Sequence, residues 1–107
     1  MIISEAKTVK IGNIDFPNVK WRTRIVFEYE NMTGESYYKI GTKLESQFKL
    51  FYCAAKIGSV ISTGKFDLTY DQFLELTDEY FNETVLQFTS ALYEKTSEVS
   101  KKKLRMK

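Results

Sequence analysis

Polar and apolar residues alternate with a period of two at the start of the chain. Apolar residues flank a polar one in both 9–11 and 14–16, and Gly12-Asn13 separates the two stretches. This alternation is typical of a strand with one buried face, and Gly-Asn can supply the positive φ angles of a tight turn. We therefore predict a short β-hairpin that Pro17 ends, because proline lacks a backbone N–H. Asn18 is then expected to cap the first helix.

From residue 21 onward the apolar spacing lengthens to three and four residues, the period of an α-helix. The stripe on this helix, with Val26 beside it, consists of Trp21, Ile25, Tyr29 and Met32. It predicts a helix over 21–32, which Thr33-Gly34 ends because glycine readily adopts the left-handed conformation that follows many helices. We expect a short second helix over 36–40.

The next helix is predicted over 43–57 and is apolar nearly all round. Thr42 and Glu45 have the spacing of a capping box at its start. Its two apolar stripes are Leu44, Phe48, Phe51, Tyr52 and Ala55, and Leu50, Ala54 and Ile57. A helix of this kind is expected to be buried at the centre of the fold. The small polar and glycine residues of 58–64 predict a loop after it.

Two further helices complete the pattern. Thr69 and Gln72 form a second capping box, which predicts a helix over 70–77, and Leu68 and Phe73 occupy the positions of a hydrophobic staple. A last helix is predicted from about residue 79 to residue 100, on the spacing of Phe81, Val85, Phe88, Leu92 and Val99. The predicted fold is mainly α: a short N-terminal β-hairpin followed by a compact bundle of four to five helices.

Length and composition favour one domain in the cytoplasm. The chain has 107 residues, close to the commonest domain size, and we expect a helical domain over 1–100 and a basic, disordered tail over 101–107. A single cysteine, Cys53, cannot form an internal disulfide. We find neither the apolar run of a signal peptide nor the roughly 20 apolar residues that a membrane span requires.

Charge is divided unevenly between the tail and the rest of the chain. The tail holds 5 of the 16 basic residues and none of the 14 acidic ones, which leaves 11 basic and 14 acidic residues elsewhere, a net charge of −3. An acidic domain of this kind is a poor partner for nucleic acid. The tail cations could contact phosphates, but they also complement the dipole of a preceding helix. Nucleic-acid binding through the tail is therefore an alternative that we do not expect.

Catalytic chemistry has little support in the sequence. Histidine, the commonest general base and metal ligand, is absent. Cys53 lies in the helix expected to be buried, where a structural thiol is expected rather than a reactive one. The neighbouring carboxylates Glu28 with Glu30, and Asp78 with Glu79, do not share a helix face. We expect no enzyme activity, no metal and no cofactor.

Aromatic residues exceed what a core of this size needs. The chain has seven tyrosines and eight phenylalanines, and tyrosine is enriched at protein interfaces because it combines a large rigid surface with a polar end. Tyr29 and Tyr52 lie on core stripes and are assigned to packing. The candidate protein-binding residues are Tyr37, Tyr38, Leu86 and Tyr93. For these three tyrosines the alternative, that they cover the core, stays open.

The order of local motifs resembles that of the tail assembly chaperones of long-tailed bacteriophages. Arg24-Ile-Val-Phe-Glu28 and Thr33-Gly-Glu-Ser36 are similar to the family's first helix and the turn after it. Leu50-Phe-Tyr-Cys-Ala-Ala-Lys56 resembles its apolar helix before a glycine. Leu68-Thr-Tyr-Asp-Gln-Phe73 resembles the start of a helix near the family's C-terminal end.

This resemblance implies a phage or prophage protein of the bacterial host cytoplasm, without a membrane partner. It implies binding to the tape measure protein, which is kept soluble, and recruitment of the tail tube protein. Self-association is compatible with this role. Two other functions stay open: a small structural virion component at the head–tail joint or in the tail, and a general helical adaptor between proteins.

Overall fold

The computed structural model of the chain describes residues 6–94, which form a hairpin followed by helices. The hairpin consists of β1 (Lys7–Ile11) and β2 (Ile14–Val19). The helical elements are α1 (Thr23–Thr33), a 3-10 turn (Tyr37–Lys39), α2 (Leu44–Thr63), α3 (Tyr70–Glu79), α4 (Phe81–Thr89) and a π-helical turn (Ser90–Glu94). This arrangement confirms the predicted mainly α fold with an N-terminal hairpin. The predicted tail and the end of the predicted last helix, including Val99, lie outside the described residues.

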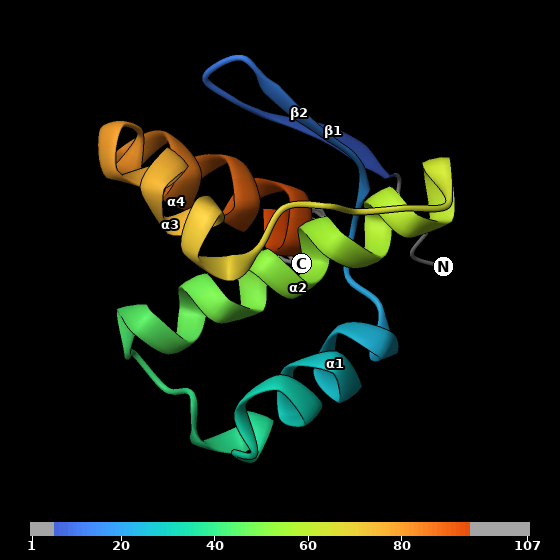
Figure 1. Cartoon of the computed structure of the whole chain (residues 1–107). Coiled ribbons are helices and arrows are strands. Elements are labelled where there is room, and N and C mark those ends of the chain that lie inside the picture. The colour runs from blue at the N-terminus through green and yellow to red at the C-terminus, as the bar shows by residue number, and fades with distance from the viewer. Residues whose placement is uncertain (1–5, 95–107) are drawn as a thin grey trace, which may run out of the picture.

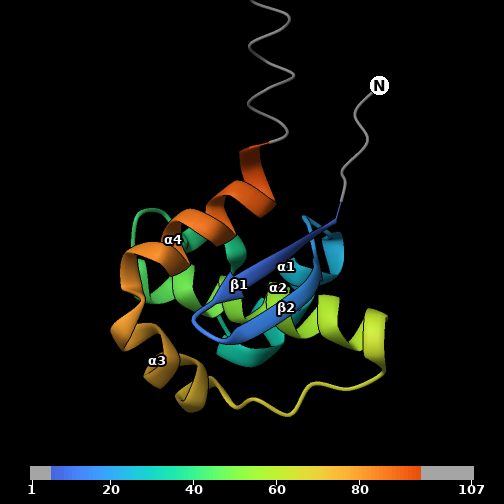
Figure 2. The same ribbon diagram turned by 90° about the horizontal axis from the view of Figure 1, so that it is seen from above.

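The helix α2 is the centre of the fold, as its pattern predicts. In Figure 1, α1 lies on one side of α2, and the hairpin lies with α3 and α4 on the other. Seen from above in Figure 2, the hairpin crosses α2, and α4 lies beside β1. Ten of the 20 residues of α2 are buried, including the consecutive residues 53–55, because the helix is covered from two sides. Within residues 6–94, no helix is long and apolar enough to cross a membrane.

Four phenylalanine rings join elements that are far apart in the sequence. Phe88 of α4 is fully buried, and its ring centroid lies 5.9 Å from that of Phe16 on β2. The same ring lies 5.9 Å from Phe73 on α3 and stacks on Phe51 of α2 at 5.2 Å. Aromatic pairs at these distances stabilise a fold beyond the burial of their surface. The cluster therefore fixes the hairpin, α3 and α4 on α2.

The second strand passes through a proline, so the prediction that Pro17 ends it is wrong. Residues 17 and 18 together face a single residue of β1, which makes this position a β-bulge. A bulge tolerates proline because the extra residue makes no ladder hydrogen bond. The extra residue also resets the side-chain alternation, so that both Phe16 and Val19 face the core.

The prediction that Asn18 caps the first helix is also wrong. Asn18 has a φ of 59° in the bulge, in the left-handed region that asparagine tolerates. Its backbone oxygen and Oδ1 accept hydrogen bonds of 2.9 and 3.0 Å from the guanidinium of Arg22. α1 begins after Arg22, and Trp21 therefore precedes the helix instead of starting its apolar stripe. The end of α1 at Gly34, whose φ is 74°, is as predicted.

Both ends of α2 differ from the prediction. Thr42 and Glu45 form no capping box, since α2 begins at Leu44 and the residue before it makes no side-chain cap hydrogen bond. The helix also continues through Gly58 to Thr63, so the predicted loop over 58–64 is wrong. A Cβ atom at Gly58 would lie 2.5 Å from the backbone oxygen of Pro17. Glycine is therefore required here by the contact between α2 and β2, and not by a helix end.

The capping box at the start of α3 is confirmed. Thr69 Oγ1 accepts a hydrogen bond of 3.1 Å from the Gln72 N–H, and Gln72 Oε1 accepts one of 2.9 Å from the Thr69 N–H. The last helix begins at Phe81, after a break at Tyr80. Tyr80 contacts the hairpin turn, where a Cβ on Gly12 would lie 2.8 Å from its ring. The Gly12 N–H also donates to Glu83 Oε2 at 3.2 Å, so the hairpin turn is attached to the corner between α3 and α4.

Replacing Thr69 with alanine is expected to lower the free energy of unfolding by about 1 kcal/mol, because a backbone N–H at the start of α3 loses its partner. Thr42→Ala is the matched control, since Thr42 is exposed and makes no such cap. Urea denaturation followed by circular dichroism measures both variants. Equal losses in the two variants would contradict this assignment of the caps.

Candidate interaction surfaces

Three of the four candidate residues lie around one surface hollow, which we name the tyrosine hollow. It has a volume of about 230 Å³ and is lined by Tyr37, Tyr38, Ile40, Gly41, Gln47, Leu50 and Tyr93. The Tyr38 side chain is 91% exposed, whereas Tyr37 and Tyr93 are half-buried. Leu86 of α4 is 69% exposed and does not line this hollow. The structure thus brings the tyrosines together without the leucine.

The ring of Trp21 packs against two of the tyrosines that line the tyrosine hollow. Its ring centroid lies 5.8 Å from that of Tyr37 and 6.0 Å from that of Tyr93. The Tyr37 N–H also donates to Glu30 Oε2 at 2.8 Å, which fastens the 3-10 turn to α1. Burial, together with the neighbouring Tyr37, raises the pKa of Tyr93 to about 12. Tyr37 and Tyr93 therefore contribute to packing, and Tyr38 is the tyrosine of this group that is free to contact a partner.

A second hollow, the acid-rimmed groove, lies where the start of α2 meets α3 and α4. Its volume is about 320 Å³, and it is lined by Leu44, Glu45, Phe48, Tyr70, Leu74, Thr77, Asp78 and Phe81. Phe48 and Phe81 stack with centroids 5.4 Å apart. Leu44 is 55% exposed and Phe81 is 44% exposed. The helical pattern placed both on core stripes, but the structure leaves them on the surface.

The third hollow, the α1–α2 groove, has a volume of about 290 Å³. Its lining residues are Arg24, Phe27, Glu28, Asn31, Lys56, Ile57 and Val60. Phe27 is 64% exposed and was not among the candidate residues. The helical spacing could have identified Phe27 as exposed, because it lies two residues after Ile25 and so points away from the buried face of α1.

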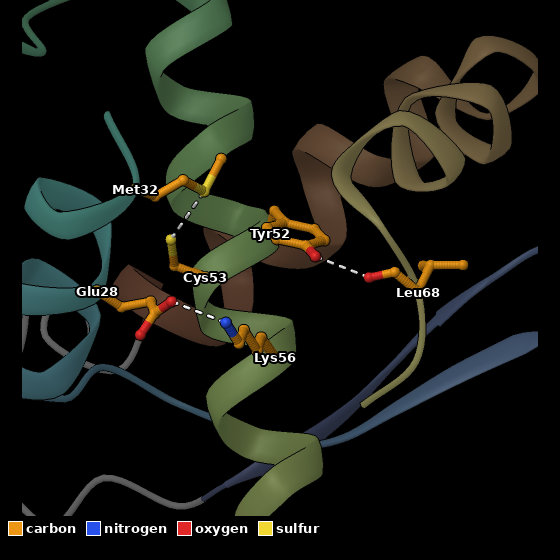
Figure 3. A network of polar contacts seen from close by, with 6 residues as sticks. All are labelled: Glu28, Met32, Tyr52, Cys53, Lys56 and Leu68. Carbon is orange, nitrogen blue, oxygen red and sulfur yellow. Dashed lines mark hydrogen bonds and ion pairs between the residues drawn. The ribbon is translucent and has the colours of Figure 1, made fainter. Parts of the chain in front are cut away.

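Polar contacts on two sides of α2 fix α1 and the segment before α3 onto this helix (Figure 3). Glu28 of α1 pairs with Lys56 of α2 at 2.9 Å, and this hydrogen bond is the main cause that raises the pKa of Lys56. The Cys53 thiol lies 3.9 Å from the Met32 sulfur. The Tyr52 hydroxyl donates to the Leu68 backbone oxygen at 2.7 Å, in agreement with the assignment of Tyr52 to packing.

Cys53 has the environment of a structural thiol. It is fully buried, and burial, together with the charge of Glu28, raises its pKa from 9.0 to about 12. The thiolate is the reactive form of cysteine, and a raised pKa removes it at neutral pH.

We expect a thiol reagent such as DTNB to leave Cys53 unmodified in the native protein at pH 8 and to modify it at once in urea. Because the unfolded thiol ionises near pH 9 and the folded one does not, the unfolded state loses this proton first. The free energy of unfolding should therefore fall as the pH rises from 9 towards 12. Urea denaturation at several pH values tests the second expectation, and rapid modification of the native protein at pH 8 would contradict the first.

Two further observations concern the polar side chains of the described residues. Within residues 6–94, no three His, Cys, Asp or Glu side chains are arranged to hold a metal ion. In the same part of the chain, every buried side-chain nitrogen and oxygen has a hydrogen-bond partner. In comparisons with known proteins, no protein-family model, curated protein or solved structure matches the chain.

Proposed function

We propose that the protein is a tail assembly chaperone of a long-tailed bacteriophage or prophage. In this role it binds the tape measure protein in the host cytoplasm, keeps it soluble and helps recruit tail tube subunits. The observation that carries the proposal is a set of large apolar side chains that are more than half exposed: Phe27, Tyr38, Leu44 and Leu86. Side chains of this kind are typical of protein-binding surfaces, and the motif order described above is similar to that of the family.

The small size of the hollows supports weak, repeated binding to an extended client. Their volumes are about 230, 290 and 320 Å³, enough for a few side chains each rather than for a folded domain. Weak contacts suit a chaperone, because tail tube subunits must displace it. Several copies along one client would recover a strong overall hold through avidity.

Co-expression with the tape measure protein from the same genome tests the proposal. We expect the client to be soluble and to co-purify with this chain, and to aggregate without it. A variant with Phe27, Tyr38 and Leu44 all changed to serine should lose most of this effect, because it removes one exposed apolar group from each hollow. Ser62→Ala, at an exposed position of α2, is the control.

The outcomes separate the proposal from its alternatives. A client that aggregates equally with and without the protein would contradict it. A protein that remains in purified phage particles in stoichiometric amounts would instead be a structural virion component. Loss of client solubility in the Ser62→Ala control would show that the effect of the triple variant is not specific to the exposed apolar groups.

A further inference from the structure

The acid-rimmed groove combines an apolar floor with charged side chains of one sign. The stacked rings of Phe48 and Phe81 form part of its floor, beside the exposed side chain of Leu44. The charged residues that line it are Glu45 from α2 and Asp78 from α3. Lys49 lies 3.9 Å from Glu45, near the limit of an ion pair, and does not line the groove.

The negative charge extends over the helices that form one wall of this groove. The segment 66–93 has no lysine or arginine, and its acidic residues are Asp67, Asp71, Glu75, Asp78, Glu79 and Glu83. Burial is the main cause that raises the pKa of Tyr70 in the groove to about 12, and the charges of Glu45 and Asp71 raise it further. The smaller part of this rise, which the two carboxylates cause, is the expected effect of negative charge near the groove.

The other two hollows lack this bias. The α1–α2 groove is lined by Arg24 and Lys56 as well as Glu28, so its charges are mixed. The tyrosine hollow is lined by no acidic or basic side chain. Among the three, the acid-rimmed groove can therefore select a partner by charge.

We infer that the acid-rimmed groove binds an amphipathic helix of the client, with leucine- or phenylalanine-sized side chains on one face and lysine or arginine beside that face. The apolar face enters the groove, as in other complexes of a helix with a groove. The flanking cations lie near Glu45 and Asp78. This inference rests on the proposed function for the identity of the client, but binding of such a helix can be measured without the client.

Two labelled peptides of about 18 residues, five helical turns, test the inference on the full chain. Both carry Leu and Phe at helical spacing, one with lysine and the other with glutamate at the flanking positions. Fluorescence anisotropy measures binding at low and high salt. We expect the basic peptide to bind about tenfold more tightly than the acidic one at low salt, and this ratio to fall as salt screens the charges.

Asp78→Lys should weaken binding of the basic peptide about tenfold and improve binding of the acidic one. Glu35→Lys is the matched control: it makes the same change of charge at an exposed residue that does not line the groove, and should change affinity little. Leu44→Ser should weaken both peptides. Both substituted groove residues are exposed, and thermal melts confirm that each variant is folded.

Equal affinity for the two peptides, or equal effects of Asp78→Lys and Glu35→Lys, would overturn the inference. A dimer of the free chain that Asp78→Lys dissociates would also overturn it, because the occupant would then be a second copy. So would a peptide of residues 95–107 that binds more tightly than the basic peptide and depends on Asp78, because the occupant would then be the chain's own tail. If the full chain binds both peptides equally and yet keeps the tape measure protein soluble, the groove is wrong and the chaperone function stands. If the basic peptide binds selectively but the client aggregates, the groove stands and the function fails.

Discussion

Replacing Phe88 with alanine is expected to lower the free energy of unfolding by about 4 kcal/mol, a large part of the stability of a small domain. The side chain is fully buried and contacts rings from β2, α2 and α3 at centroid distances of 5.9, 5.2 and 5.9 Å. Alanine would leave a cavity at the point where these elements meet. Urea denaturation measures the loss.

Leu86→Ala is the matched control for this prediction, because it removes an apolar side chain from the same helix. Leu86 is 69% exposed, so its loss should change the free energy of unfolding by less than about 0.5 kcal/mol. If the two variants lost similar stability, the packing of Phe88 against β2, α2 and α3 would not be what stabilises the position of α4. A loss of client binding in Leu86→Ala without a loss of stability would assign Leu86 to a contact surface.

The local pattern of the sequence predicted the elements well, because each depends on neighbours along the chain. The two-residue period located the hairpin, and the helical period located α1 and α2. The box of Thr69 and Gln72 predicted the start of α3 correctly, since both partners lie within one turn. The capping box predicted from the same spacing at Thr42 and Glu45 does not form. Residues with this spacing can make the two hydrogen bonds, but the path of the backbone decides whether they do.

The errors occur where a distant segment decides the local structure. Pro17 was expected to end a strand, but the bulge accommodates it. Trp21 was placed on a helix stripe, but it packs between Tyr37 and Tyr93 before the helix begins. These outcomes depend on contacts between residues far apart in sequence, which periodicity does not encode.

The candidate surfaces could be predicted only in part for the same reason. An excess of aromatic residues indicated that some would lie outside, and Tyr38 does. The pattern could not show that Leu44 and Phe81, both on apolar stripes, would lie at a groove between three helices. That result depends on where α3 and α4 diverge from α2, which is a property of the assembled fold.

The second large effect is expected at Gly58, where alanine should lower the free energy of unfolding by about 3 kcal/mol. A Cβ at this position would lie 2.5 Å from the Pro17 oxygen, 2.6 Å from the Asn18 oxygen and 3.0 Å from the Asn18 carbonyl carbon. All three are backbone atoms of β2, so no side-chain rotation can relieve the contact. The hairpin must move away from α2, and that loss exceeds the gain of about 1 kcal/mol in helix propensity.

Ser62→Ala provides the control, since it changes an exposed residue of the same helix to alanine. This variant should be as stable as the parent or slightly more stable. Urea denaturation measures both variants, and hydrogen exchange of the β-strand amides should increase in Gly58→Ala alone. If residues 58–64 were the loop that their composition predicts, Gly58→Ala would be neutral or stabilising, because alanine restricts the unfolded chain. The sign of the change therefore decides whether α2 continues through Gly58 to pack directly on the backbone of β2.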